Sequence, residues 1–167
     1  TLLLPFSDRP NEACPLSTSA ALVKRSGNLG GVPLPPGHLP ASASSKTFLR
    51  SAYEFEKRGM TDDAIITYQS ALLRWPEDID ILLALANAYY HSHQLRDAEQ
   101  SYRKLLSLEP GHPLALNNLA DLLCRTGRSN DALRVLGEAV TDDIEMQSII
   151  KATRKEITNG CTPLPKR

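Results

Sequence analysis

Apolar residues in the middle of the chain recur at intervals of three and four, which is the spacing of one face of an α-helix. The clearest run is Leu82, Leu85, Ala86 and Tyr89, which forms one stripe at 3.6 residues per turn. Alternation with a period of two, which would indicate β-strands, is absent from this part of the chain. The pattern therefore predicts helices and an all-α fold.

The same pattern returns at a constant interval along the chain. Asp-Ala pairs stand at 63–64, 97–98 and 131–132, and so keep a 34-residue step. Several other residues keep the same step, namely Ala52, Ala86 and Ala120, Tyr68 and Tyr102, Pro76 and Pro110, and Gly59 and Gly127. A period of this length is typical of helical repeat arrays, in which each unit is a pair of helices.

Small residues and helix-ending residues occupy the fixed places of the repeat. Alanine is expected where two helices cross closely, because a larger side chain there would cost roughly 1–3 kcal/mol. Pro76 and Pro110 lack the N–H that a continuing helix needs, so each is expected to close a unit. Gly59 and Gly127 are expected to end first helices in a left-handed conformation. In the second unit His93 must adopt that conformation with strain, or the turn is different.

On these residues the chain resembles the tetratricopeptide repeat family, whose unit is a helix, a tight turn and an antiparallel second helix. The resemblance covers roughly residues 45–146, or three units. It implies a right-handed superhelical array of antiparallel helix pairs. In the third unit Leu136 replaces the aromatic residue of the second helix and Ile144 replaces the closing proline. We therefore expect the array to end there.

The chain divides into a proline-rich start, a repeat domain and a tail. Residues 1–45 include a Pro- and Gly-rich run followed by small residues, which predicts an irregular segment and linker with a serine capping the first helix. We expect the repeat domain over residues 46–158 and a flexible tail over 159–167. Within the repeat domain the expected parts are three units and a capping helix, over about 45–78, 79–112, 113–146 and 146–158.

The expected last helix carries Ile149, Ile150 and Ile157 as apolar positions. Its first role would be to cover the open end of the stack. A second role, binding a partner or pairing with another copy of the chain, is the alternative, and the narrow apolar stripe of the helix favours it less.

Composition and charge limit the classes of partner. The chain has 167 residues, of which 41% are hydrophobic and 23% charged, as in ordinary soluble globular proteins. Its formal net charge is +0 and it has no strongly basic patch, so nucleic acid is not an expected partner. The longest apolar run, 81–90, is shorter than the roughly 20 residues that span a membrane. We expect a soluble protein and leave the compartment open between cytoplasm and periplasm.

The cysteines and histidines predict no metal site and no cofactor. Cys14, Cys124 and Cys161 are odd in number and widely spaced, so neither a disulfide framework nor a metal cluster is implied. His91 and His93 are two residues apart and cannot both face one metal ion from a continuous helix.

The start of the chain resembles a second family. The segment from Ala13 to Val23, around Cys14 and Pro15, is similar to the start of papain-like cysteine peptidases of the bacteriocin-processing type. Residues 34–40 look like the proline-rich joint that precedes tetratricopeptide repeats in some bacterial members. The family's glycine after the cysteine is missing, and the chain lacks the sheet that would bring a histidine to the thiol, so we expect no enzyme. The alternative function is the docking arm or truncated remnant of such a peptidase.

The main predicted function is a protein-interaction scaffold that binds a peptide or protein segment in the concave groove of the first helices. Asparagine offers both a donor and an acceptor, which suits the backbone of an extended peptide. The groove candidates come from all three units and are Tyr53, Glu56, Asn87, Tyr90, His91, Asn117, Asp121 and Arg125.

One specific partner is not expected. Family members that hold the acidic tails of chaperones do so with cations and asparagines on their first helices. The matching places here carry no cation and are Leu49, Tyr53, Ala84, Leu114 and Asn118.

Overall fold

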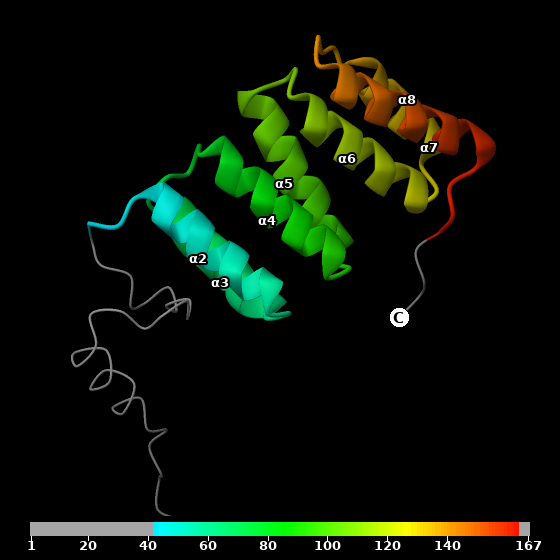
Figure 1. Ribbon diagram of the computed structural model, residues 1–167. Helices are drawn as coiled ribbons and strands as arrows, with labels where there is room; N and C mark the ends of the chain where they lie inside the picture. The colour runs from blue at the N-terminus through cyan, green and yellow to red at the C-terminus, as the bar shows by residue number, and fades with distance from the viewer. Residues whose placement is uncertain (1–41, 164–167) are drawn as a thin grey trace, which may run out of the picture. The chain divides into compact units, whose positions relative to one another are not determined.

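A computed structural model of the chain describes residues 42–163 (Figure 1). These residues contain seven α-helices and no β-strand, which confirms the all-α fold. The helices are α2 (Ser45–Lys57), α3 (Thr61–Leu72), α4 (Ile79–His91), α5 (Leu95–Leu108), α6 (Pro113–Arg125), α7 (Ser129–Gly137) and α8 (Ile144–Asn159). The predictions for residues 1–41, which include the linker and the peptidase-like stretch, lie outside the described residues.

Consecutive helices pack as pairs, α2 with α3, α4 with α5, and α6 with α7. The second helix of each pair also packs on the first helix of the next pair, and α8 packs on α6 and α7 at the end of the stack. Figure 1 shows α2, α4 and α6 in one layer, with their partner helices behind them. The first helices begin at residues 45, 79 and 113 and the second helices at 61, 95 and 129, so both series keep the 34-residue step.

Each first helix begins at a side-chain cap. Ser44, Asp78 and His112 each accept, with a side-chain atom, the backbone N–H of the residue three positions on. Such a cap satisfies one of the N–H groups that a helix start leaves without a partner. The expected serine cap of the first helix is therefore confirmed, and the three caps occupy equivalent places of the repeat.

The turns inside the units all contain one left-handed residue. Gly59 has φ 74°, Gly127 has φ 83°, and His93 has φ 61°. The N–H of the residue after each donates to the carbonyl five positions back, at 3.0, 2.8 and 2.9 Å respectively, which closes the first helix. Of the two alternatives for the second unit, the strained histidine is the one observed.

The repeated alanines lie in the core of the array. Six of them have no exposed surface, and these are Ala52, Ala64, Ala86, Ala98, Ala120 and Ala132. Tyr68 and Tyr102 are equally placed in the second helices and are each 1% exposed. The core is therefore built from the same positions in every unit, as the repeated pattern predicted.

The single tryptophan lies in the first unit, just after α3. Its ring meets the ring of Phe48 edge-on, with the centroids 5.6 Å apart. The guanidinium of Arg74 lies 4.5 Å from the Trp75 ring centroid, a cation–π contact. Trp75 therefore packs against the first part of α2, within the first unit.

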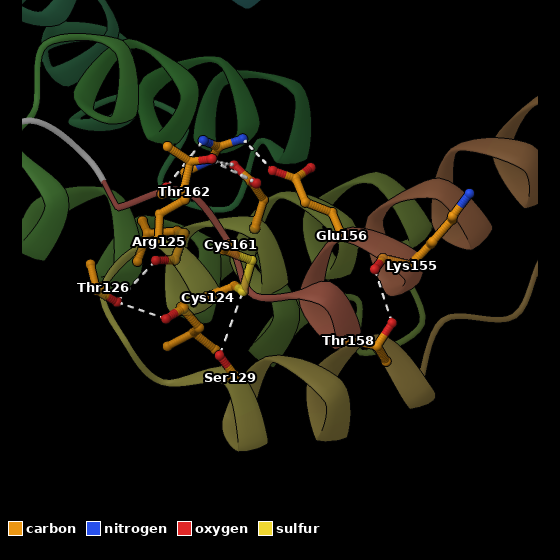
Figure 2. Close-up of a disulfide and its surroundings, with 12 residues drawn as sticks. Cys124, Arg125, Thr126, Ser129, Lys155, Glu156, Thr158, Cys161 and Thr162 are labelled. Atoms are coloured by element: carbon orange, nitrogen blue, oxygen red, sulfur yellow. Dashed lines mark hydrogen bonds and ion pairs between the residues drawn. A yellow bond between two sulfur atoms is a disulfide. The ribbon is translucent and has the colours of Figure 1, made fainter.

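The odd number and wide spacing of the cysteines implied no disulfide framework, but two of them are paired. Cys124, near the end of α6, and Cys161, two residues after α8, form a disulfide across a sequence separation of 37 (Figure 2). The two cysteines meet because α8 packs against α6, which spacing in the sequence does not reveal. Residues 160–163, within the expected flexible tail, are thus attached to α6. Cys14 lies outside the described residues.

Candidate protein-binding groove

An open groove of about 990 Å³ lies between the first helices α2 and α4. Four of the predicted residues line it, Tyr53 and Glu56 from α2 and Asn87 and His91 from α4. The groove thus brings together side chains from two units. The other predicted residues lie on α4 and α6, toward the third unit.

The groove combines an apolar floor with exposed cations. Partly buried Leu49, Leu83 and Ala84 line it from both helices. Lys46 and Arg50 line it near the start of α2 and are exposed. Residues 46, 50 and 53 are four and three positions apart, so they share one face of the helix. That spacing is the signal that could have identified the two cations from the sequence.

Glu56 lies toward the other end of α2. Its Oε2 accepts a hydrogen bond from the Tyr68 hydroxyl at 3.2 Å. Burial raises the pKa of Glu56, while the Tyr68 hydrogen bond and the nearby His91 act in the opposite direction. Burial and the Glu56 carboxylate raise the pKa of Tyr68, so the proton of this hydrogen bond stays on the phenol.

Asn87 stands at the centre of a polar network between α4 and α6. Its Oδ1 accepts from the Tyr102 hydroxyl at 2.5 Å and from Asn118 Nδ2 at 3.0 Å. Asn87 lines both the groove and a smaller pocket of about 180 Å³ that reaches α6. Because its oxygen is already used twice, the amide N–H groups remain to donate to a ligand.

A second set of polar contacts begins at Tyr90. Its hydroxyl donates to Asp121 Oδ2 at 2.5 Å, and Arg125 Nε donates to Asp121 Oδ1 at 2.9 Å. Burial and the Asp121 carboxylate raise the pKa of Tyr90, so the phenol remains the donor. Arg125 Nη2 also pairs with Glu156 of α8 at 3.2 Å. One chain of polar contacts therefore joins α4, α6 and α8.

Asn117 differs from the other predicted residues. It is 7% exposed, and its Oδ1 has no hydrogen-bond partner among the described residues. Its Nδ2 lies 3.4 Å from Asn118 Oδ1. Tyr102 was not among the residues predicted from the sequence, because those came from the first helices alone. The signal was present, since Tyr68 and Tyr102 occupy equivalent places of the repeat and both hydroxyls reach groove residues of a first helix.

Residues 42–163 contain neither a metal-binding cluster nor a helix that could span a membrane. No group of three or more His, Cys, Asp or Glu side chains is arranged to hold a metal ion. None of the helices there has the length and apolar character needed to cross a membrane. The resemblance to cysteine peptidases, and with it the docking-arm alternative, rests on residues outside this range and stays a prediction.

Comparison with known sequences supports the repeat. The family model of the tetratricopeptide repeat matches residues 91–149. The chain is 32% identical over 94 residues to the tetratricopeptide repeat and J domain-containing co-chaperone DNJ1 of Fusarium oxysporum, covering 56% of this chain and 18% of that protein. It is 39% identical over 54 residues to cellulose synthase operon protein C of Pseudomonas fluorescens, covering 32% of this chain and 4% of that one. The chain thus spans less than a fifth of either relative.

Comparison with solved structures shows the fold. A tetratricopeptide repeat protein from Parabacteroides merdae matches 74% of this chain and 53% of its own with a TM-score of 0.60 and 18% identity. MamA matches 70% of this chain and 73% of its own, with a TM-score of 0.57 and 15% identity. Yeast Tom70 matches 69% of this chain and 24% of its own, with a TM-score of 0.56 and 20% identity. The described residues therefore have the all-α tetratricopeptide-repeat fold.

Proposed function

We propose that this chain is a protein-interaction module that binds an extended peptide segment in the groove between α2 and α4. The observation that carries the proposal is the groove itself, which combines an apolar floor with polar groups available to a ligand. Proteins with this fold generally act as scaffolds, and stacked helix pairs present concave surfaces used for recognition. The fold and its concave surface both support a binding role in place of catalysis.

The lining residues suggest how a peptide would be held. Leu49, Leu83 and Ala84 would contact an apolar side chain of the peptide. The Asn87 amide would donate to a backbone carbonyl, since its own oxygen is already used. Lys46 and Arg50, which have no ion-pair partner among the described residues, would attract an acidic group near the start of α2. The favoured ligand is therefore an extended segment with apolar and acidic residues.

The test begins with selection of peptides from a displayed random library against the intact chain. Binding of the selected peptides is then measured by fluorescence anisotropy for the parent, Arg50→Glu and Tyr53→Ala. Tyr53 is 55% exposed, so its removal leaves the core intact. We expect each groove variant to weaken binding by about tenfold or more, equivalent to about 1.4 kcal/mol.

Lys104→Glu is the matched control, because Lys104 is an exposed cation on α5 and lies outside the groove. It makes a charge change similar to that of Arg50→Glu and is expected to bind within about twofold of the parent, as surface changes away from a site usually do. Circular dichroism melting of all variants checks that the fold is kept. Equal binding by the parent and both groove variants would place the peptide elsewhere and contradict the proposal.

A further inference from the structure

The Cys124–Cys161 disulfide attaches the chain after α8 to the end of α6. The Cα atoms of the two cysteines are 5.8 Å apart. Cys124 is 3% exposed, whereas Cys161 is only partly buried. Figure 2 shows the disulfide beside Arg125, Thr162 and Ser129. We name residues 160–163 the C-terminal strap.

Besides the disulfide, the strap packs the partly buried Cys161 against the core and makes one hydrogen bond to α6. The Thr162 carbonyl accepts from Arg125 Nη1 at 3.5 Å, at the exposed surface. Thr162 and Pro163 are both exposed. Hydrogen bonds and ion pairs at an exposed surface contribute little to stability. The covalent bond is therefore the main attachment of the strap, whereas α8 itself also inserts the buried Ile150 and Ile157 into the core.

We propose that Cys124–Cys161 is a reversible redox site, and that its reduction by a dithiol releases the C-terminal strap from Arg125. The attacking thiolate of the dithiol would form a bond to Sγ of Cys161, the less buried of the two cysteines, and the Sγ–Sγ bond would break. The electron pair of that bond leaves on Cys124 as a thiolate. The second thiol of the reductant then displaces Cys161, so that the dithiol becomes a disulfide and both cysteines take up protons as thiols.

The surroundings of Cys124 suit a leaving thiolate. The Ser129 hydroxyl lies 3.6 Å from Cys124 Sγ and donates to it, because the sulfur of a disulfide carries no hydrogen. Ser129 is the first residue of α7, so the sulfur also lies near the positive end of that helix. Both features stabilise negative charge on sulfur and favour its departure.

Release of the strap changes the surroundings of Arg125. The guanidinium loses its contact with Thr162 and keeps Asp121 and Glu156 as partners. Nη1 of Arg125, which lies in the third unit, then becomes available for another contact. This inference does not depend on peptide binding in the groove between α2 and α4.

The experiment uses the full chain carrying Cys14→Ser, so that only the two paired cysteines are counted. Free thiols are measured by maleimide labelling and mass spectrometry, and amide hydrogen exchange is measured with and without dithiothreitol. We expect no free thiol in the oxidised protein and two after reduction. Exchange at the amide of Gly160, whose N–H donates to the Ile157 carbonyl at 3.3 Å, should then rise by about tenfold or more, while exchange in α2 to α5 stays within about twofold. A Cys161→Ser variant should show the fast exchange in both conditions.

Three results would overturn the proposal. Both thiols could remain free after treatment with oxidised glutathione, which would show that the disulfide does not form. Reduction could leave exchange in the strap unchanged, which would show that other contacts hold it. Reduction could instead accelerate exchange throughout α2 to α5, which would make the disulfide a requirement of the whole fold and not a local release site.

Discussion

The hydroxyl of Tyr90 in α4 donates a hydrogen bond to Asp121 in α6 at 2.5 Å, and so joins the second unit to the third. The two residues are 31 positions apart and therefore do not occupy equivalent places of the repeat. Arg125 completes the contact by donating to the same carboxylate. Neighbouring units are thus joined by polar contacts near the groove as well as by the buried alanines and leucines.

This contact should be measurable as a coupling energy. Tyr90→Phe and Asp121→Ala are each expected to lower the free energy of unfolding by about 1–2 kcal/mol, because each removes the hydrogen bond from the Tyr90 hydroxyl to the Asp121 carboxylate. The double variant should lose less than the sum of the two, with a coupling of about 1 kcal/mol. Urea denaturation of the four proteins gives the cycle. Additive losses would show that the two side chains do not interact in solution.

The strained histidine should be improvable. His93 has φ 61°, a conformation that glycine adopts without a side-chain penalty. His93→Gly is therefore expected to raise the free energy of unfolding by about 0.5–1 kcal/mol. Gly59→Ala is the reciprocal change at φ 74°, where no atom approaches the new methyl group, and should cost about 1 kcal/mol. Thermal denaturation that ranks the two variants in the reverse order would refute the strain argument.

The alanine positions should not tolerate larger side chains. Ala98 has no exposed surface, so Ala98→Leu is expected to destabilise the array by about 1–3 kcal/mol through forced separation of the helices. Ala152 is an exposed alanine of α8 and supplies the matched control. Ala152→Leu should change stability by less than about 0.5 kcal/mol. Equal melting temperatures for Ala98→Leu and the parent would contradict the proposed crossing.

Glu56 should titrate above its ordinary pKa of 4.5, because burial raises the pKa of this carboxyl. A raised pKa in the folded state means that the folded protein binds this proton more tightly than the unfolded chain. The contribution of Glu56 to stability is thus fully present below pH 4.5 and is lost as the pH rises through the folded pKa.

Tyr68→Phe sharpens this test. It removes a hydrogen bond that lowers the pKa of Glu56, so that pKa should rise further in the variant. The shift is followed by NMR titration of the Glu56 side-chain carboxyl in both proteins. A pKa at or below 4.5 in the parent would count against the role of burial.

The features that the sequence predicted are those set by local chemistry. The constant step between helix starts follows from the spacing of alanines, prolines and tyrosines. Ser44 caps α2 because a short side-chain oxygen at that place reaches a free N–H. The left-handed turn at His93 was one of the two alternatives that its equivalence to Gly59 and Gly127 left open. In each case the residue and its effect lie within one helix or one turn.

The features that it missed depend on packing between distant segments. Cys124 meets Cys161 only because α8 lies against α6. Tyr102 belongs to a second helix, yet its hydroxyl reaches Asn87 in the layer of first helices. Asn117 occupies the same place of the repeat as Leu83, but its buried oxygen shows that an equivalent position need not face the same surroundings. The spacing of residues in the sequence predicts the face of the helix on which a side chain lies, but it does not predict how deeply that side chain is buried.

The placement of Trp75 gives the protein an internal fluorescent reporter of one unit. It is the only tryptophan in the sequence, and its ring contacts belong to the first unit. The disulfide belongs to the other end of the described array, where α6 meets the chain after α8. Each unit of a repeat array is stabilised mainly by its neighbours, so melting can begin at one end. The difference between the fluorescence and circular dichroism midpoints would therefore measure how cooperatively the three units unfold.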